Sequence, residues 1–267
     1  MTRDELRHSL EFYQDLGVTD LNVRQPKKAV TPDSPVVTTS VVPESVVPAR
    51  VATAKIATAS TPRREPAMEL PPLAPAGDTL EAIQHDIGPD CRLCRLCEQR
   101  NKIVFGSGDP QSKLVFVGEG PGADEDAQGL PFVGRAGQLL TQMIENTASK
   151  EGIPIQRPDV YICNVVKCRP PENRTPEPDE MQICGQFLFR QLMVIQPKAI
   201  CALGSTAAKA LLNTKEGVTK LRGNWHKWRD IPLMVTYHPS YLLRPYNQNA
   251  KREAWEDLKK VLHFVYD

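Results

Sequence analysis

The strongest constraint on the fold is an alternation of short apolar runs and longer helical stretches that begins near Asp78. The runs have five to seven residues and are rich in valine, isoleucine and leucine, which is typical of strands buried on both faces. Strands that alternate with helices form a parallel sheet covered on both sides. The sequence therefore predicts an α/β fold, a single three-layer α/β/α domain with a four-stranded parallel sheet. The predicted strands are residues 114–118, 160–166, 199–203 and 231–237, and the predicted helices are residues 137–149, 178–195, 205–212 (capped by Ser205) and 250–265.

Three unusual loops follow the carboxyl ends of these strands. They cover residues 118–135, 164–175 and 237–245 and are rich in glycine, proline and polar side chains. In open α/β sheets, ligands bind outside the carboxyl ends of the strands. The functional site is therefore expected where these three loops meet.

The region before this domain has a different composition. Residues 21–78 are rich in Pro, Ala, Val and Thr without helical or strand periodicity, and we predict a disordered linker there. Ahead of it, residues 1–20 place Leu6 and Leu10 at helical spacing, which predicts a short amphipathic helix. This helix either docks a protein partner or is a frayed end, and the sequence leaves both possibilities open. The globular domain is predicted to cover residues 79–267.

The charge of the chain is balanced, with 33 Lys and Arg against 32 Asp and Glu and a formal net charge of +1. A nucleic-acid surface must therefore be a local patch and not a field over the whole molecule. The mixed charges of the first residues do not resemble a secretory signal, and no run of about 18 apolar residues predicts a membrane span. We expect a cytoplasmic, intracellular monomer with no membrane contact. Its seven cysteines are then expected to stay reduced, which makes them candidates for metal ligation.

Three cysteines, Cys91, Cys94 and Cys97, follow the spacing C-x2-C-x2-C. A bacterial ferredoxin would add a fourth cysteine three residues later, followed by proline, and this sequence has neither. Cys168, in a proline-rich loop, and Cys184, near the start of a predicted helix, are the other candidates for a four-thiolate site. Spacing alone leaves both zinc and an iron–sulfur cluster open. The two remaining cysteines lie in predicted strands and are expected to be core residues: Cys163 and Cys201.

Three longer stretches carry a resemblance to a known family. They are GEGPGADEDAQGLPFVGRAGQLL at residues 118–140, NVVKCRPP at residues 164–171 and HPSYLLR at residues 238–244. In this order they resemble the family 4 uracil-DNA glycosylases, the iron–sulfur branch of that superfamily, over about residues 90–262. The resemblance implies a DNA repair enzyme that hydrolyses the N-glycosidic bond of flipped-out deoxyuridine, releases uracil and leaves an abasic site. The resemblance also implies that residues 79–267 are the catalytic domain and that uracil-containing DNA is the partner. It further implies that the protein is associated with the nucleoid.

The same resemblance implies a [4Fe–4S] cluster bound by Cys91, Cys94, Cys168 and Cys184. Cys97 falls where the family commonly has a non-ligand, so it is expected to be a spare thiol. The cluster would fasten the segment before the first strand to the loop after the second strand. Both segments would then be held where they contact DNA.

An enzyme that removes a base from DNA must extract it from the stack and read its edge in a closed pocket. By resemblance, Phe132 supplies the ring on which uracil stacks. Asn164 carries a donor and an acceptor on one amide, which match O4 and N3–H of uracil and mismatch cytosine. His238 corresponds to the family's histidine that donates a hydrogen bond to uracil O2, where negative charge develops as the bond breaks.

The backbone of the loop that starts with Gly118, Glu119 and Gly120 is expected to complete the uracil pocket, because glycines let the main chain approach the base. Better-known members of the superfamily have an acidic residue at the position of Gly120, so the group that activates water is open here. Glu119 and Glu125 are the candidates for this role. Gly122 stands where other members carry a bulky ring that excludes thymine, and Glu125 is expected to fill that space.

Residues 240–244 resemble a loop that enters the minor groove of DNA. Leu242 or Leu243 is expected to wedge the vacated base stack, and Arg244 is expected to meet phosphate. Arg135 is a further candidate for contact with the DNA backbone. Three other basic residues in the proline-rich loop are weaker candidates: Lys167, Arg169 and Arg174.

Three other functions compete with this reading. A cross-linking relative traps uracil-DNA through a histidine in an inserted loop, but residues 170–176 contain no histidine. The second competing function is that of a non-enzymatic DNA-binding protein with an iron–sulfur cluster or zinc. Such a protein would leave no alkali-labile sites in uracil-containing DNA. A ferredoxin-like electron carrier is the third, and the incomplete cysteine motif disfavours it.

Overall fold

The computed structural model describes residues 74–244 and 247–267. The amphipathic helix predicted for residues 1–20 lies outside the described residues. The linker predicted for residues 21–78 also lies outside them up to residue 73, so both remain predictions. The described part includes every strand and helix that the sequence predicted for the globular domain.

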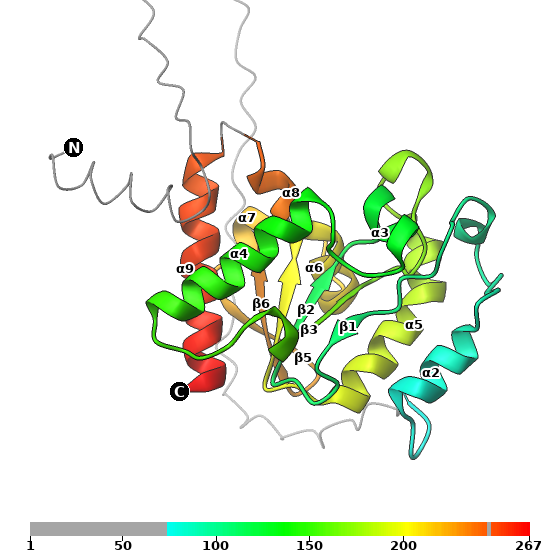
Figure 1. The fold of residues 1–267 in the computed structure, drawn as a ribbon, viewed down its shortest axis with the longest axis horizontal. Helices are drawn as coiled ribbons and strands as arrows, with labels where there is room; N and C mark the ends of the chain where they lie inside the picture. The colour runs from blue at the N-terminus through cyan, green and yellow to red at the C-terminus, as the bar shows by residue number, and fades with distance from the viewer. Residues whose placement is uncertain (1–73, 245–246) are drawn as a thin grey trace, which may run out of the picture. The chain divides into compact units, whose positions relative to one another are not determined.

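Six strands form one mixed sheet: β1 (Ser107–Gly108), β2 (Leu114–Gly118), β3 (Tyr161–Asn164), β4 (Ala199–Leu203), β5 (Trp225–Trp228) and β6 (Ile231–Thr236). Their order is β1-β3-β2-β4-β6-β5 (Figure 1). The four central strands are the predicted ones and run parallel, whereas the two edge strands are antiparallel to their neighbours. The predicted total of four strands was therefore wrong. Both missed strands lack an apolar run, because β1 has only two residues and β5 carries His226 and Lys227 in its centre.

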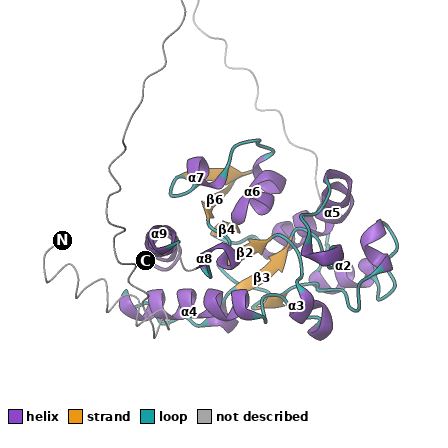
Figure 2. Cartoon of the chain, turned by 90° about the horizontal axis from the view of Figure 1, so that it is seen from above, coloured by secondary structure: helices purple, strands orange, loops and turns teal. Residues whose placement is uncertain are grey.

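Eight α-helices are described: α2 (Leu80–Ile87), α3 (Ala123–Gln128), α4 (Arg135–Lys150), α5 (Pro178–Ile195), α6 (Gly204–Leu212), α7 (Val218–Leu221), α8 (Pro239–Leu242) and α9 (Gln248–Tyr266). Side chains of β2 alternate between two apolar clusters, with Leu114 and Phe116 in one and Val115 and Val117 in the other. The first cluster includes α4 and α9, and the second includes α2, α5 and α6. Figure 2 shows α4 and α9 on one side of the sheet and α5 and α6 on the other, so the domain has the three layers that were expected.

The long helices agree with the predicted ones to within two residues at each end. The prediction that Ser205 caps a helix was wrong, because α6 begins one residue earlier, at Gly204. Gly204 has a φ of 89°, and a Cβ there would lie 2.9 Å from the Cβ of His238. Glycine at this position lets the helix start directly beside His238. None of the described helices combines the length and the apolar character that a membrane crossing requires.

The register of the sheet aligns the carboxyl ends of the central strands. Gly118 is paired with Asn164 between β2 and β3, and Leu203 is paired with Thr236 between β4 and β6. The loops that follow these strands therefore leave from one edge of the sheet.

Candidate active site

A pocket of about 250 Å³ opens at this edge of the sheet. Its walls come from the loops after β2, β3 and β6, so the three loops that the sequence singled out meet around one cavity. The pocket is lined by Glu119, Gly120, Pro121, Gly122, Glu125, Phe132, Ala136, Asn164, Pro170, Asn173, Arg174, His238 and Ser240.

Asn164, the last residue of β3, lines the pocket with a buried side chain. The residue is only 1% exposed, and its Oδ1 has no hydrogen-bond partner among the described residues. Buried polar atoms are nearly always hydrogen-bonded, so this oxygen is available to a ligand. A Cβ on residue 118 would lie 2.4 Å from this oxygen and 2.6 Å from the ring of Phe132. Glycine at position 118 therefore makes room for both side chains.

Phe132 is held in an unusual backbone conformation. Its φ is 54°, in the left-handed region that bulky residues rarely adopt, and such strain is concentrated at functional sites. The following helix packs closely on this turn, since a Cβ on Gly137 would lie 1.9 Å from the carbonyl oxygen of Phe132. The ring centroid of Phe132 lies 5.6 Å from that of His238, with an interplanar angle of 36°. The two rings are therefore neighbours in the pocket.

His238 is fixed in one neutral tautomer. Its Nδ1 accepts a hydrogen bond from the backbone amide of Ser240 at 3.2 Å and lies 2.8 Å from the hydroxyl oxygen of the same residue. An amide donor to Nδ1 leaves the ring proton on Nε2. Burial lowers the pKa of His238 to about 4, against the opposing effect of the charge of Glu125. At neutral pH the side chain is therefore an uncharged Nε2–H donor.

Glu125 holds the glycine-rich loop together. Its carboxylate accepts hydrogen bonds from the backbone amides of Gly122 at 3.1 Å and of Val133 and Gly134 at 2.9 Å each. A Cβ on residue 122 would lie 2.8 Å from Oε2 of Glu125, so the carboxylate occupies the space beside that glycine. Three backbone amides thus engage both oxygens of this carboxylate within the protein.

Glu119 is bound less completely. Its Oε2 accepts a hydrogen bond from the hydroxyl of Thr206 in the first turn of α6. Glu119 also lines a second cavity of about 360 Å³, which shares His238 and Ser240 with the first pocket. Glu119 therefore contributes to the walls of both cavities.

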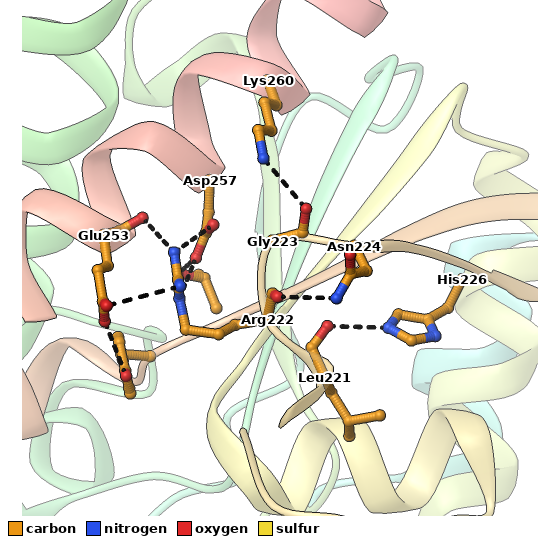
Figure 3. Close-up of polar contacts among 10 residues, drawn as sticks. Leu221, Arg222, Gly223, Asn224, His226, Glu253, Asp257 and Lys260 are labelled. Carbon is orange, nitrogen blue, oxygen red and sulfur yellow. Dashed lines mark hydrogen bonds and ion pairs between the residues drawn. The ribbon is translucent and has the colours of Figure 1, made fainter. Parts of the chain in front are cut away.

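Strand β6, which leads to His238, ends beside a buried ion pair. Figure 3 shows the two members of this pair, Arg222 and Asp257. Arg222 donates two hydrogen bonds of 3.0 and 2.7 Å to the carboxylate of Asp257, which is fully buried. Thr236, the last residue of β6, donates a hydrogen bond of 2.8 Å to the same carboxylate. Tyr237 donates from its hydroxyl to Glu253 at 2.9 Å, and Arg222 donates to the carbonyl of Glu253 at 2.9 Å. The network thus fixes the two residues that precede the histidine.

Replacing Asp257 with alanine is expected to lower the free energy of unfolding by about 3 kcal/mol, because it leaves the poorly exposed guanidinium of Arg222 without its carboxylate. Urea unfolding at pH 7 measures the change. Lys260→Ala is the matched control, since it removes an exposed hydrogen bond to the carbonyl of Gly223 and a nearby charge but leaves the Arg222–Asp257 pair in place. The control is expected to change stability by no more than about 0.5 kcal/mol. Equal effects of the two substitutions would contradict this reading.

The loop expected to enter DNA folds as the single helical turn α8, which separates its two leucines. Leu242 is 1% exposed and packs in the core, so the prediction that it could wedge DNA was wrong. Leu243 is 41% exposed and remains the wedge candidate. Arg244 is exposed, with its guanidinium carbon 5.8 Å from the ring centroid of Tyr241. Arg135 is the first residue of α4 and is also exposed.

The basic residues of the proline-rich loop differ in their surroundings. Lys167 is 1% exposed, so the prediction that it contacts the DNA backbone was wrong. Arg174 is paired with Glu180 through hydrogen bonds of 2.9 and 2.7 Å. Arg169 donates to the side chain of Asn173 at the surface and remains a candidate.

Five cysteines line a separate cavity beside α2 and α5. They include the four predicted ligands together with Cys97, and apolar side chains such as Ile87 and Phe187 complete the walls. The two cysteines expected in the core, Cys163 and Cys201, are 1% and 0% exposed. The cysteines that line the cavity are Cys91, Cys94, Cys97, Cys168 and Cys184.

Burial and nearby N–H donors determine the state of these thiols. Burial raises the pKa of Cys168 to about 12 and that of Cys184 to about 11, so a bound cationic group would be needed to hold them as thiolates. Arg100 donates to the sulfur of Cys168 at 3.5 Å, and the amide of Lys167 donates to that of Cys184 at 3.3 Å. Such donors tune the thiolates of iron–sulfur clusters.

Two residues that contact pocket side chains were missed from the sequence. Ser240 fixes the tautomer of His238, and its place inside the HPSYLLR stretch could have indicated this. Thr206 binds Glu119 from a different helix, and nothing in the sequence connects the two.

Known proteins share the sequence of this domain. Residues 105–259 match the model of the uracil DNA glycosylase superfamily. A type-4 uracil-DNA glycosylase of Thermotoga maritima is 46% identical over 177 residues, which are 66% of this chain and 89% of that protein. Type-4 uracil-DNA glycosylases of Sulfurisphaera tokodaii and Archaeoglobus fulgidus are 42% and 38% identical, each over 192 residues, which are 69% of this chain and 84% and 92% of the relatives. The chain therefore belongs to the uracil DNA glycosylase superfamily and to its type-4 family.

Proposed function

We propose that this protein is a uracil-DNA glycosylase that hydrolyses the N-glycosidic bond of an everted deoxyuridine during DNA repair. The bond between C1′ and N1 breaks, its electron pair leaves with uracil, and water adds to C1′ to leave an abasic site. One observation carries the proposal. An aromatic ring from the loop after β2, an unpartnered amide oxygen from the end of β3 and a neutral imidazole donor from the loop after β6 line the same pocket. The type-4 relatives support it, because they are named for this activity.

The pocket selects uracil through Asn164 and Phe132. The free Oδ1 of Asn164 accepts the N3–H of uracil, and the amide of the same side chain donates to O4. Cytosine has no N3–H and carries an amino group in place of O4, so it would leave both atoms of the buried amide unpaired. A site of this kind rejects the wrong partner by large factors, because unpaired buried polar groups are costly. The ring of Phe132 stacks on the base.

His238 stabilises the leaving group. As the bond to C1′ breaks, negative charge accumulates on the uracil ring and is shared with O2. The neutral Nε2–H of His238 donates a hydrogen bond to this oxygen, and the donor is already oriented because Ser240 holds Nδ1. A preorganised donor acts most strongly where charge develops.

Glu119 is assigned to orienting the water nucleophile. Its hydrogen bond from Thr206 engages one carboxylate oxygen, and its position in the walls of both cavities gives water access to it. Glu125 is instead assigned to holding the glycine-rich loop, because three backbone amides already donate to it. Glu125 also occupies the space beside Gly122, where it is expected to exclude the methyl group of thymine.

The proposal includes a [4Fe–4S] cluster held by Cys91, Cys94, Cys168 and Cys184. When bound, the cluster supplies covalent links between the segment before β1 and the loop that follows β3. The apolar walls of the cavity and the two N–H donors to sulfur support this assignment. Cys97 is assigned as a spare thiol on the same cavity.

Replacing Leu243 with alanine is expected to lower excision from double-stranded DNA about tenfold and to leave stability within about 0.5 kcal/mol of the wild type. The side chain is exposed, so it acts on DNA and not on the core. Leu242→Ala is the matched control, and it is expected to destabilise the fold by roughly 2–4 kcal/mol because it opens a core cavity. Rates on paired and single-stranded uracil, measured beside urea unfolding, separate the two effects. An unchanged rate for Leu243→Ala on duplex DNA would exclude it as the wedge.

The low pKa of His238 predicts the acid side of the pH profile. The side chain stays neutral down to about pH 4, so single-turnover excision is expected to show no loss centred near pH 6.5. The unfolded chain protonates this histidine near pH 6.5 and the folded protein only near pH 4. Between these values the unfolded state binds more protons, so this residue lowers stability as the pH falls through that window. An acid limb near pH 6.5 that is absent in a His238 variant would contradict the assignment.

The proposed function is tested with duplex oligonucleotides that contain paired uracil, mismatched uracil or thymine. Wild-type protein is expected to create alkali-labile sites at uracil and none at thymine. Release of free uracil in step with these sites shows turnover, whereas binding without release would point to a non-enzymatic DNA-binding protein. A shifted, denaturation-resistant band would point to covalent capture instead.

A further inference from the structure

Lys167 is a buried lysine at a place where a charged side chain is costly. Only 1% of it is exposed, and burial lowers its pKa. Its Nζ donates hydrogen bonds to the backbone carbonyl of Asn164 at 2.8 Å and to Oε1 of Gln191 at 2.6 Å. Both acceptors are neutral oxygens, and an unpaired amine here would carry a large desolvation cost. The position of Lys167 therefore depends on these two contacts.

Gln191 is itself held in one orientation. It is fully buried on α5, and its Nε2 donates to the backbone carbonyl of Phe105 at 3.1 Å and to the hydroxyl of Tyr161 at 3.3 Å. With the amide nitrogen engaged in this way, Oε1 is left facing Lys167. The helix thus provides a fixed acceptor that holds the lysine against the end of β3.

The other end of Lys167 belongs to the cysteine cavity. The residue lines that cavity, its backbone amide donates to the sulfur of Cys184 at 3.3 Å, and its carbonyl accepts from the amide of Val104 at 2.8 Å. The main chain of Lys167 therefore contacts the cysteine cavity, while its side chain contacts Asn164 of the uracil pocket.

We infer that Lys167 is a positioning residue for Asn164, which ties the strand end that reads uracil to the wall of the cysteine cavity. The inference rests on the proposed function, because it assumes that Asn164 binds uracil. The side-chain Oδ1 of Asn164 has no hydrogen-bond partner among the described residues, so its position depends on packing and on the backbone that carries it. Lys167 holds the carbonyl of that backbone. The amide of the same peptide, that of Val165, donates to the carbonyl of Gly118 at 3.0 Å, so Lys167 holds the other side of this peptide. Loss of its hydrogen bond lets the peptide tilt and misplaces the side-chain amide in the pocket.

The test is a double-mutant cycle in which the affinity for free uracil is measured by NMR titration. This measurement does not require the protein to turn over a substrate. Lys167→Met keeps a similar volume and removes the donor, and it is expected to weaken uracil binding about tenfold. In an Asn164→Ala background the same substitution is expected to have almost no further effect, because the residue through which it acts is gone. Lys198→Met is the matched control, since Lys198 also donates to a backbone carbonyl, that of Val265 at 2.9 Å, and it should leave uracil affinity unchanged.

The outcomes separate this inference from the proposed function. Wild-type uracil affinity in Asn164→Ala would overturn the proposed function itself. If Asn164→Ala weakens binding, unchanged affinity in Lys167→Met overturns the inference, as does an equal loss in both backgrounds. Iron content is measured in every variant. If Lys167→Met loses iron or fails to fold, Gln191→Met decides by the same cycle, because Gln191 does not line the cysteine cavity.

Discussion

Replacing His238 with alanine is expected to slow single-turnover uracil excision by roughly two to three orders of magnitude, the usual cost of removing one donor to a developing anion. The free-uracil affinity should fall much less, because Phe132 and Asn164 still line the pocket. The rate is measured by alkaline cleavage of a duplex with one uracil, at saturating protein. A large fall in rate with a small fall in affinity is the pattern of a group that acts mainly in the transition state.

Two further variants sharpen this prediction. Ser240→Ala removes the hydroxyl near Nδ1 of His238 but keeps the backbone amide that donates to it, so a loss of no more than about tenfold is expected. His226→Ala removes a histidine of the edge strand β5, which contacts the carbonyl of Leu221, and should leave the rate unchanged. A wild-type rate in His238→Ala would remove the leaving-group role from this pocket.

The central sheet could be predicted from the sequence because each of its parallel strands is buried on both faces. Burial forces a continuous apolar run such as Leu114–Gly118, and such a run is visible without any tertiary information. The edge strand β5 could not be found in this way. Its Trp225–Trp228 run contains the exposed Lys227 and the half-buried His226, and its pairing with β6 depends on a neighbour that only the fold supplies.

The location of the pocket could also be predicted from the order of the strands. Asn164 is the last residue of β3 and His238 lies two residues after β6, and both strands end at one edge of the sheet, so the topology alone brings them together. The difference between Leu242 and Leu243 was beyond the sequence, because it depends on the single helical turn that sends one side chain into the core. The difference between Glu119 and Glu125 was also beyond it, because it depends on which backbone amides the loop turns toward each carboxylate.

Lys167 is the clearest case of a residue that the sequence misrepresents. A lysine in a loop beside two arginines is ordinarily a solvated charge, and a DNA contact was the natural expectation. Its burial follows from two oxygens, on Asn164 and Gln191, that reach it from a strand end and from a helix. No local sequence pattern predicts the hydrogen bond from Lys167 to Gln191, which lies 24 positions away.

Replacing Cys168 with serine is expected to abolish the brown colour of an iron–sulfur protein and to lower the melting temperature by roughly 10 °C. Loss of a cross-link that joins distant segments typically costs about 2–5 kcal/mol, and each kcal/mol shifts the melting temperature of a domain of this size by roughly 2–4 °C. Cys168 lies four residues after Asn164 in the same loop. Freeing this loop should therefore also weaken the binding of free uracil.

The matched controls are the other cysteines, because they distinguish a ligand from a buried thiol. Cys201→Ala removes a fully buried core thiol and should keep its iron, with only a modest loss of stability. Cys97→Ser alters a thiol on the same cavity as the proposed ligands and should also keep its iron. Full iron content in Cys168→Ser would exclude it as a ligand. If Cys97→Ser loses iron and Cys94→Ser keeps it, Cys97 is a ligand in place of Cys94. The cavity that holds the group would be unchanged.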